Sequence, residues 1–350
     1  MSAASEGRPG GAGGTGRAGE DRLDALREEA RRTGSVAGRG VDVEGGPIPA
    51  AADGDAVGYY GQPVVKAPVW TWEVPVYFFV GGMAGMSGVI AAASRFMTGG
   101  LDVAVPALWI AALGAATSGL LLISDLGRSS RFLNMLRVFK RRSPMSVGAW
   151  TLTGFGGAST VALVLGSVQA HLAASGGGLP ALSVLLTIFL LAAGLLGGVL
   201  GTYTGVLIGA TAIPAWFEHR LLLPAHFGIA GLGSAAALLQ ILGFGGPPLV
   251  AIALAAAGAE CLVGLTVELH RHGAADRALR AGGSGALLRL GGLLAGPAAL
   301  VLWIVHVPIA ASAAFLAGAL VSRFGWLAAG RASARDPEAT FAAQRARTRG

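Results

Sequence analysis

One acidic residue, Glu260, stands alone near the centre of an apolar stretch that runs from residue 247 to residue 268. A charged side chain at the centre of a membrane helix costs about 2.5–3.5 kcal/mol to insert, so such residues normally face other helices and serve a function. Glu260 is therefore predicted to transfer protons or to contact a ligand. The alternative is a neutral carboxyl group that only hydrogen-bonds two helices together.

A second group of polar side chains lies near the ends of other apolar stretches. Glu73 and Tyr77 stand where one stretch begins, and Asp125 stands where another ends. Arg128 follows Asp125 by three residues, a spacing at which two helical side chains can form an ion pair. Tyr203 lies within a long apolar stretch, where a tyrosine hydroxyl usually hydrogen-bonds to a neighbouring helix. Together these side chains could exchange protons or hydrogen bonds with a ligand.

Residue types that bind metals are scarce. Cys261 is the only cysteine, which excludes a disulfide framework and a cysteine-ligated iron–sulfur cluster in this chain. None of the six histidines is expected in the middle of an apolar stretch, whereas a haem held between membrane helices needs two. We therefore expect no iron–sulfur cluster, haem or metal site, so that any redox role depends on a diffusible carrier and on a partner's metals.

The segment after Asp125 is rich in basic residues. Within residues 124–150, Phe132, Met135, Leu136 and Phe139 recur at helical spacing, which predicts an amphipathic helix in the membrane interface. The opposite side of this segment is a candidate docking surface for a cytoplasmic partner, made by Arg131, Asn134, Arg137, Lys140 and Arg141. The alternative is a loop that orients the chain and binds anionic lipid, each basic residue contributing about 1 kcal/mol near the surface.

Membrane helices are the elements that must position these side chains. Charged residues make up only 13% of the 350 residues, and apolar residues make up 53%. With a mean hydropathy of +0.63, this composition excludes a soluble globular domain and a disordered chain. About 20 apolar residues span a membrane. Stretches of that length occur at 74–97, 103–124, 147–170, 181–212, 225–243, 247–268, 286–305 and 308–327. The predicted fold is an all-α integral membrane protein with eight transmembrane helices.

The basic residues indicate how these helices are oriented. With eight spans, all of the 26 Lys and Arg residues except Arg95 fall on one side. The positive-inside rule then places both termini in the cytoplasm of a cell-membrane protein. Five tryptophans are expected in an interfacial belt on the same side: Trp70, Trp72, Trp150, Trp216 and Trp326. The net charge of +7 thus marks a membrane face, and nucleic-acid binding is not expected.

The regions outside the apolar stretches have different compositions. Residues 1–58 are rich in Gly, Ala, Arg and Glu, which predicts a disordered cytoplasmic tail. Residues 59–330 form the predicted membrane domain, and residues 331–350 form a cytoplasmic C-terminal tail. No secretory or Tat signal is recognised at the start. The proline-containing segment 59–73 is predicted to be either an aromatic anchor or a structured plug over a pocket at headgroup level.

Three segments of the sequence resemble the NrfD/PsrC family, the integral membrane subunits of polysulfide-reductase-type complexes. They are VYFFVGGMAG at 76–85, DLGRSSRFLNMLRVF with SPMSVGAW within 125–150, and YTGVLIGATAIPAW at 203–216. The resemblance covers roughly residues 59–330 and implies that the eight helices form two four-helix bundles.

The resemblance implies a quinone-binding membrane anchor. Such a subunit exchanges electrons between the membrane pool of menaquinone or ubiquinone and a ferredoxin-like iron–sulfur subunit, which in turn serves a molybdopterin catalytic subunit. By motif, Tyr203 is the best candidate for a quinone contact, with Asp125 and Tyr77 at the same membrane edge and Arg128 orienting the aspartate. Asp125 and Glu260 are then the candidates for proton transfer, and the chain alone is not expected to be catalytic.

Two other functions remain open at this point. A secondary transporter would use a midplane carboxyl such as Glu260, although transporters tend to contain inverted repeats and none is recognised in this sequence. A purely structural anchor would bind the same partners without a working quinone site.

Overall fold

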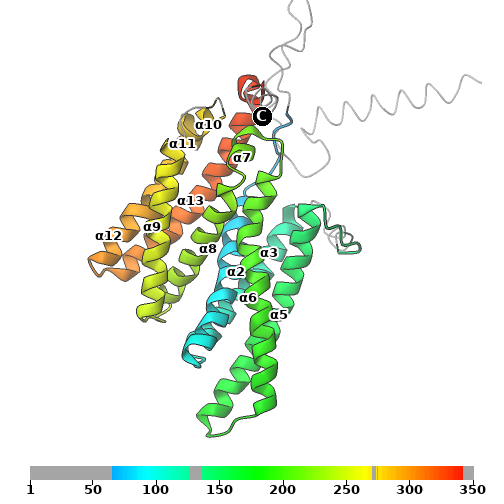
Figure 1. The fold of residues 1–350 in the computed structure, drawn as a ribbon, viewed down its shortest axis with the longest axis vertical. Coiled ribbons are helices and arrows are strands. Elements are labelled where there is room, and N and C mark those ends of the chain that lie inside the picture. Colours follow the sequence, from blue (N-terminus) through cyan, green and yellow to red (C-terminus); the bar gives the residue numbers. More distant parts are fainter. Residues whose placement is uncertain (1–64, 126–133, 135, 270–272, 274, 342–350) are drawn as a thin grey trace, which may run out of the picture. The chain divides into compact units, whose positions relative to one another are not determined.

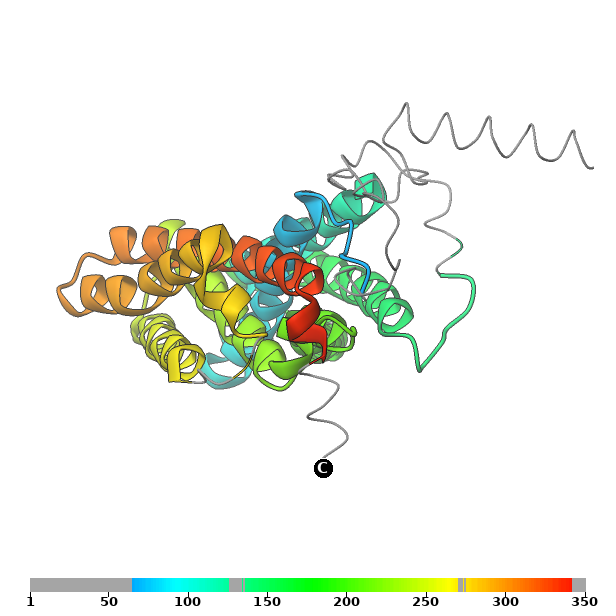
Figure 2. The ribbon, with the colours of Figure 1, turned by 90° about the horizontal axis from the view of Figure 1, so that it is seen from above.

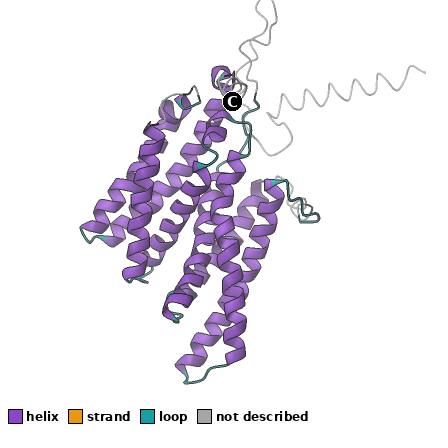
Figure 3. Ribbon diagram, in the orientation of Figure 1, coloured by secondary structure: helices purple, strands orange, loops and turns teal. Residues whose placement is uncertain are grey.

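The computed structural model describes residues 65–125, 134, 136–269, 273 and 275–341. Every regular element in these residues is a helix (Figure 3). Eight helical stretches among them are long and apolar enough to cross a membrane. This confirms the prediction of an all-α, multi-pass membrane protein. The predicted N-terminal tail, residues 1–58, lies outside the described residues.

The spans follow one another along the chain with short connections (Figure 1). The first six are α2 (Glu73–Thr98), α3 (Ala104–Asp125), α5 (Pro144–Ala174), α6 (Pro180–Gly209), α8 (Leu222–Ile241) and α9 (Pro247–Leu269). The seventh combines α11 (Gly282–Leu293), the π-helical turn η2 (Leu294–Ala298) and α12 (Ala299–Ile304), and the last is α13 (Pro308–Arg335). Two short helices, α7 (Pro214–Glu218) and α10 (Arg277–Arg280), lie between spans.

Proline residues fix where several helices begin. Pro144, Pro180 and Pro308 each occupy the first turn of a span, where the missing N–H has no helical partner in any case. Ser143 also caps α5 by accepting a hydrogen bond from the Ser146 backbone N–H. At the end of α2, Gly99 has a left-handed φ of 68°, a conformation that terminates helices.

Helix α2 packs against α3 and α6, which belong to the first four spans, and also against α8, which is the fifth span. Its glycines allow a close approach to α6. A Cβ atom on Gly85 would overlap the backbone oxygen of Gly197, and one on Gly88 would lie 3.0 Å from the carbonyl oxygen of Ala193. Small residues thus bring helix backbones together, as expected in lipid. Because α2 and α8 contact each other directly, the division into two four-helix bundles stays a prediction.

Several helix ends meet on one face of the molecule. The Thr71 hydroxyl, just ahead of α2, donates a hydrogen bond to Asp125 Oδ1 at the end of α3, at 3.0 Å. Arg277 of α10 forms ion pairs with Asp336 and Glu338, which follow α13, at 3.4 and 2.9 Å. Figure 1 shows α7, α10 and the C-terminal end of α13 at the same end of the helices, and Figure 2 views the helices from above. The cytoplasmic location of this face stays a prediction.

Two of the five tryptophans expected in the interfacial belt are covered by other parts of the protein, and the belt itself stays a prediction. Trp216 and Trp326 are almost fully buried. Trp216 Nε1 donates a hydrogen bond to the backbone oxygen of Trp326 at 2.7 Å, and the missing side chain of Gly330 leaves room for the Trp216 ring. An indole whose N–H is paired in this way does not need the water of an interface. Trp72 and Trp150 are exposed.

The amphipathic helix predicted after α3 does not continue through its described part. Asn134 is helical, but residues 136–143 form turns, bends and irregular backbone. The reason is local: the Ser146 hydroxyl accepts a hydrogen bond from the Lys140 backbone N–H at 3.0 Å and donates one to the Val138 oxygen at 3.3 Å. Such side-chain bonds offer the backbone an alternative to the helix.

Helix α13 extends beyond its predicted end at residue 327. It runs through Arg335, so residues 331–335, which the sequence places in the C-terminal tail, belong to this helix. Arg323, which the orientation argument assigns to the cytoplasmic face, lies in the middle of α13 and is 1% exposed. That assignment of Arg323 is wrong, because the apolar stretch is longer than predicted and other helices cover the side chain.

Candidate functional site

Two tyrosines from different helices lie together inside one end of the helix assembly. Tyr77 is four residues into α2 and Tyr203 is six residues before the end of α6, which places both about 6–9 Å inside the helix ends. Both side chains are buried, and their hydroxyl groups are close enough to interact electrostatically. The structure thus brings together two of the residues that the sequence singles out.

Glycine and serine residues shape the space around these rings. A Cβ atom on Gly148 of α5 would overlap the ring and the hydroxyl group of Tyr203. A Cβ atom on Gly81 would lie 3.3 Å from both Tyr77 Cε2 and Ser118 Oγ. The buried Ser118 hydroxyl has no hydrogen-bond partner within the described residues. The surroundings of Tyr77 therefore include a hydroxyl group that remains available to a ligand.

Two carboxyl groups lie at the helix ends on the same side. Asp125, at the end of α3, accepts the hydrogen bond from Thr71, and Glu73 of α2 is close enough to Asp125 to interact with it electrostatically. In the described part of the chain, the buried Oε2 atom of Glu73 has no hydrogen-bond partner. A buried carboxyl oxygen without a partner is costly, so Glu73 is able to accept a proton or a hydrogen bond.

The segment ahead of α2 is held against the helices at this end. The Trp70 ring stacks on Trp216 with centroids 5.4 Å apart, and it meets Phe78 edge-on at 6.2 Å. Phe78 in turn lies 6.1 Å from Phe227 of α8. Such aromatic pairs contribute about 0.5–1.5 kcal/mol each beyond their buried area. The segment is therefore anchored to the core by an aromatic stack next to Tyr77.

The basic residues predicted to act near this site are described only in part. Arg128 and Arg131 lie outside the described residues. The other residues of the predicted docking surface are exposed, namely Asn134, Arg137, Lys140 and Arg141. Exposure leaves them accessible to a protein partner or to lipid headgroups.

Glu260 lies in a second polar cluster, formed by α8, α9 and α13. Its Oε1 atom is 3.2 Å from His226 Nδ1, and both side chains are 3–4% exposed. Arg323 is close enough to Glu260 to interact with it electrostatically. The Arg323 Nη2 group donates a hydrogen bond to the backbone oxygen of Phe227 at 3.2 Å, and its guanidinium lies 3.7 Å from the centroid of the Phe227 ring. Glu260 thus faces other helices, and its neighbours are two basic side chains rather than Asp125.

His226 and Arg323 are the two members of this cluster that the sequence does not single out. The expectation that no histidine lies in the middle of an apolar stretch is not contradicted by His226, which falls near the start of the predicted stretch 225–243 and lies four residues into α8. The leucines at 221–223 extend the helix toward the preceding loop and place His226 about one turn inside it. For Arg323, the apolar run FGWLAA at 324–329 shows that the span continues past the charge.

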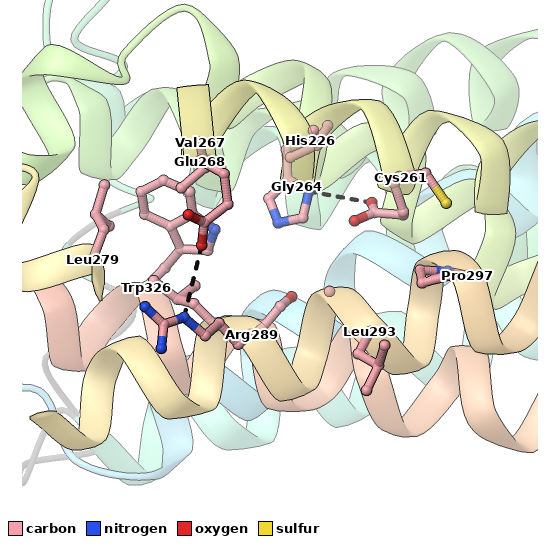
Figure 4. A pocket seen from close by; sticks show the side chains of 15 residues that line it. His226, Cys261, Gly264, Val267, Glu268, Leu279, Arg289, Leu293, Pro297 and Trp326 are labelled. Carbon is pink, nitrogen blue, oxygen red and sulfur yellow. Dashed lines mark ion pairs between the residues drawn. The ribbon is translucent and has the colours of Figure 1, made fainter. Parts of the chain in front are cut away.

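A cavity of about 390 Å³ lies beside the Glu260 cluster (Figure 4). Residues from α9, α11 and α13 form most of its walls, and His226 reaches it from α8. Figure 4 shows two ion pairs along it, the His226–Glu260 pair and a second between Glu268 and Arg289. We call this cavity the α9–α11 crevice.

A smaller polar group lies outside the spans, between α7 and α10. His219 Nε2 is 3.9 Å from Asp276 Oδ1, and the Gly273 backbone N–H donates a hydrogen bond to Asp276 Oδ2 at 3.2 Å. Burial, and then the nearby Asp276 carboxylate, raise the pKa of Glu218 above its ordinary value. This group therefore resists deprotonation of Glu218.

A match to a known protein family covers the tyrosine pair but not most of the crevice. Among the described residues, no set of three His, Cys, Asp or Glu side chains is arranged to hold a metal ion. The family described as Polysulphide reductase, NrfD, matches residues 62–245. That range includes both tyrosines and Asp125, whereas α9 to α13 and most of the crevice lie beyond it. No curated protein matches the chain.

Proposed function

The chain belongs to the NrfD family, and on that premise we propose that it is the quinone-reactive membrane subunit of a larger oxidoreductase. In this proposal the chain exchanges electrons between the membrane quinone pool and a partner iron–sulfur subunit. That partner serves a catalytic subunit of the molybdopterin type. The chain itself supplies the quinone site and the anchor.

The observation on which the proposal depends is the pair of buried phenols, Tyr77 and Tyr203, at the same end of the helices as the carboxyl groups of Asp125 and Glu73. Phenol hydroxyls can donate hydrogen bonds to the two oxygens of a quinone. The unpaired Ser118 hydroxyl and Glu73 carboxyl oxygen are further groups, within the described residues, that a ligand would satisfy. The chemistry of these side chains thus fits a small neutral ring with polar oxygens.

When bound, a quinone supplies the exchange of two electrons and two protons. In the proposal, Tyr203 and Tyr77 orient its oxygens, and Asp125 accepts or donates protons at the membrane edge. The Thr71 hydrogen bond holds the Asp125 carboxyl in place, and Arg128 is proposed to orient it from the following segment. Because Glu73 lies beside Asp125, a second carboxyl is at hand for the second proton.

The electron partner is proposed to dock on the face where these helix ends meet. The exposed residues Arg137, Lys140 and Arg141, together with Asn134 and Arg131, would meet acidic groups on the iron–sulfur subunit. A role of Glu260 in proton transfer is a separate part of the proposal, because Glu260 has His226 and Arg323 as neighbours.

The test uses membranes that contain the complete complex. Reduced decyl-ubiquinone or menadiol is added, and the rate at which the partner clusters become reduced is followed. The double variant Tyr203→Phe, Asp125→Asn is expected to lower this rate by about 10²-fold or more, the usual effect of removing acid–base groups. Asp102→Asn, at an exposed position beyond the opposite end of α3, is the matched control and should keep the wild-type rate.

Wild-type rates in the double variant would contradict the proposal. So would purification of the chain with bound proteins that include no iron–sulfur subunit. Solute uptake by the chain alone in proteoliposomes would instead indicate a transporter, which needs no electron partner.

A further inference from the structure

The α9–α11 crevice is an apolar space with polar groups at defined places. Its apolar walls include Val263 and Val267 of α9, Leu288 and Leu293 of α11, and Trp326 of α13. Leu293 is 58% exposed on the outside of the helices, so in a bilayer the crevice borders lipid. A hydrophobic molecule could therefore enter it without passing through water.

The crevice follows the helix axes over about two turns. Glu260 and Glu268 both line it and are separated by eight residues of α9, about 12 Å of helix. The Glu268–Arg289 pair, 3.7 Å apart, belongs to the end nearer the helix termini. Glu260 lies deeper, nine residues before the end of α9, and His226 reaches it from a position four residues into α8. The two pairs give the crevice one outer and one inner polar group.

The inner pair has unused hydrogen-bonding capacity. Within the described residues, neither the ring nitrogens of His226 nor the Oε1 atom of Glu260 have a hydrogen-bond partner. The 3.2 Å approach between them is close enough for an ion pair but lacks the alignment of a hydrogen bond. Because buried polar atoms without partners are costly, a ligand oxygen placed between them would remove an unfavourable contribution.

Glycine residues keep the crevice open. Gly264 of α9 and Gly292 of α11 both line it, and a Cβ atom on either would meet no other atom within 4 Å. The same wall contains Pro297 in the π-helical turn η2, and single π-helical turns often occur at functional sites. The volume of about 390 Å³ falls within the range of small-ligand pockets.

We propose that the α9–α11 crevice is a second binding site for an isoprenoid quinol, separate from the tyrosine pair. One hydroxyl of the quinol ring donates a hydrogen bond to Glu260 and accepts one from His226. The ring lies against the apolar walls next to Trp326, and the isoprenoid tail leaves between the helices toward lipid. The choice of a quinol as the occupant rests on the proposed function, whereas the crevice and its unpaired atoms do not.

The test uses the full chain in phosphatidylcholine nanodiscs and a photoreactive azido derivative of decyl-benzoquinone in its reduced form. After illumination, labelled peptides are identified by mass spectrometry. Wild-type chain is expected to be labelled in α9 and α11, and separately in α6 around Tyr203. In Gly264→Leu, which fills the crevice, the α9 and α11 label should fall at least about tenfold, while the α6 label stays.

The chain offers a matched control for this variant. Gly258 also lies on α9, and a Cβ atom added there would meet no other atom within 4 Å, but Gly258 does not line the crevice. Gly258→Leu should therefore keep the label. Should Gly264→Leu fail to elute as a folded species in gel filtration, Gly292→Leu and its control Gly283→Leu on α11 repeat the comparison.

Each outcome decides between the two sites. Equal α9 and α11 labelling in the crevice-filled and control variants would overturn the inference, since the label would then come from the outer surface. Labelling around Tyr203 alone would overturn it and leave the proposed function intact. Labelling at neither place would contradict both.

Discussion

The position of the Tyr203 ring depends on a missing side chain on the neighbouring helix. Gly148→Ala would place a methyl group where the Tyr203 ring and hydroxyl now lie. Tyr203 is buried and cannot simply swing into open space. Forcing an extra methyl group into a packed core costs about 1–3 kcal/mol. Against this, replacing a helical glycine by alanine gains roughly 1 kcal/mol.

A Gly157→Ala variant separates the gain in helix propensity from the cost of the extra methyl group. Gly157 lies on the same helix and is exposed, and a Cβ atom added there would meet no other atom within 4 Å, so the variant should show only the gain from helix propensity. We expect Gly148→Ala to be less stable than Gly157→Ala by about 1–3 kcal/mol, measured by SDS titration of the circular dichroism signal in detergent.

A double-mutant cycle tests the cause directly. In a Tyr203→Ala background the ring is gone, so Gly148→Ala should lose its penalty and the coupling between the two positions should be about 1–3 kcal/mol. A coupling within about 0.5 kcal/mol of zero is the range of independent sites. That result would refute the idea that Gly148 is needed to make room for the Tyr203 ring.

Three further outcomes are expected. Arg323→Met should destabilise the chain by about 3–5 kcal/mol in the same titration, because it removes the bond to the Phe227 carbonyl and leaves the buried Glu260 with only one of its two basic neighbours. A loss below about 1 kcal/mol would contradict a contribution of these contacts to stability. Trp216→Phe should cost about 0.5–1.5 kcal/mol, because it removes the hydrogen bond from the indole N–H to the Trp326 carbonyl of α13. An unchanged midpoint would contradict a contribution of this hydrogen bond to stability. Burial and Asp276 raise the pKa of Glu218 above 4.5, so the folded chain binds this proton more tightly than the unfolded chain. The stability that Glu218 contributes therefore falls as the pH rises from 4.5 through the raised pKa. Glu218→Gln should flatten that part of the profile of stability against pH, and an unaltered profile would contradict the assignment.

The spans can be predicted because lipid imposes a simple requirement on sequence. A helix that crosses a bilayer must be apolar along its length, whatever it packs against. The eight stretches are therefore visible without tertiary information. The meeting of Tyr77 and Tyr203 is expected from the family resemblance, and it also requires the packing of α2 against α6.

Sequence reasoning fails where packing overrides a local rule. Charge counting groups Arg323 with the basic residues of the cytoplasmic face, because the sequence does not reveal that Phe227 and Glu260 accommodate it within the helices. The burial of Trp216 is not visible in the sequence, because the carbonyl that accepts its N–H is 110 residues away in the chain. The helix predicted after α3 fails for a local reason, the serine at position 146 that bonds to the preceding backbone.

The buried charge cluster has a consequence for how the protein is made. The acid of α9 and the histidine of α8 leave the ribosome well before α13, which carries the arginine. Until that last span arrives, the acid resides in the membrane at an insertion cost of about 2.5–3.5 kcal/mol without its final neighbour. In a chain truncated before α13, the sixth span, α9, is therefore expected to be less stably inserted in the membrane. In this protein, the synthesis of α13 completes the interior of a helix pair that is synthesised earlier.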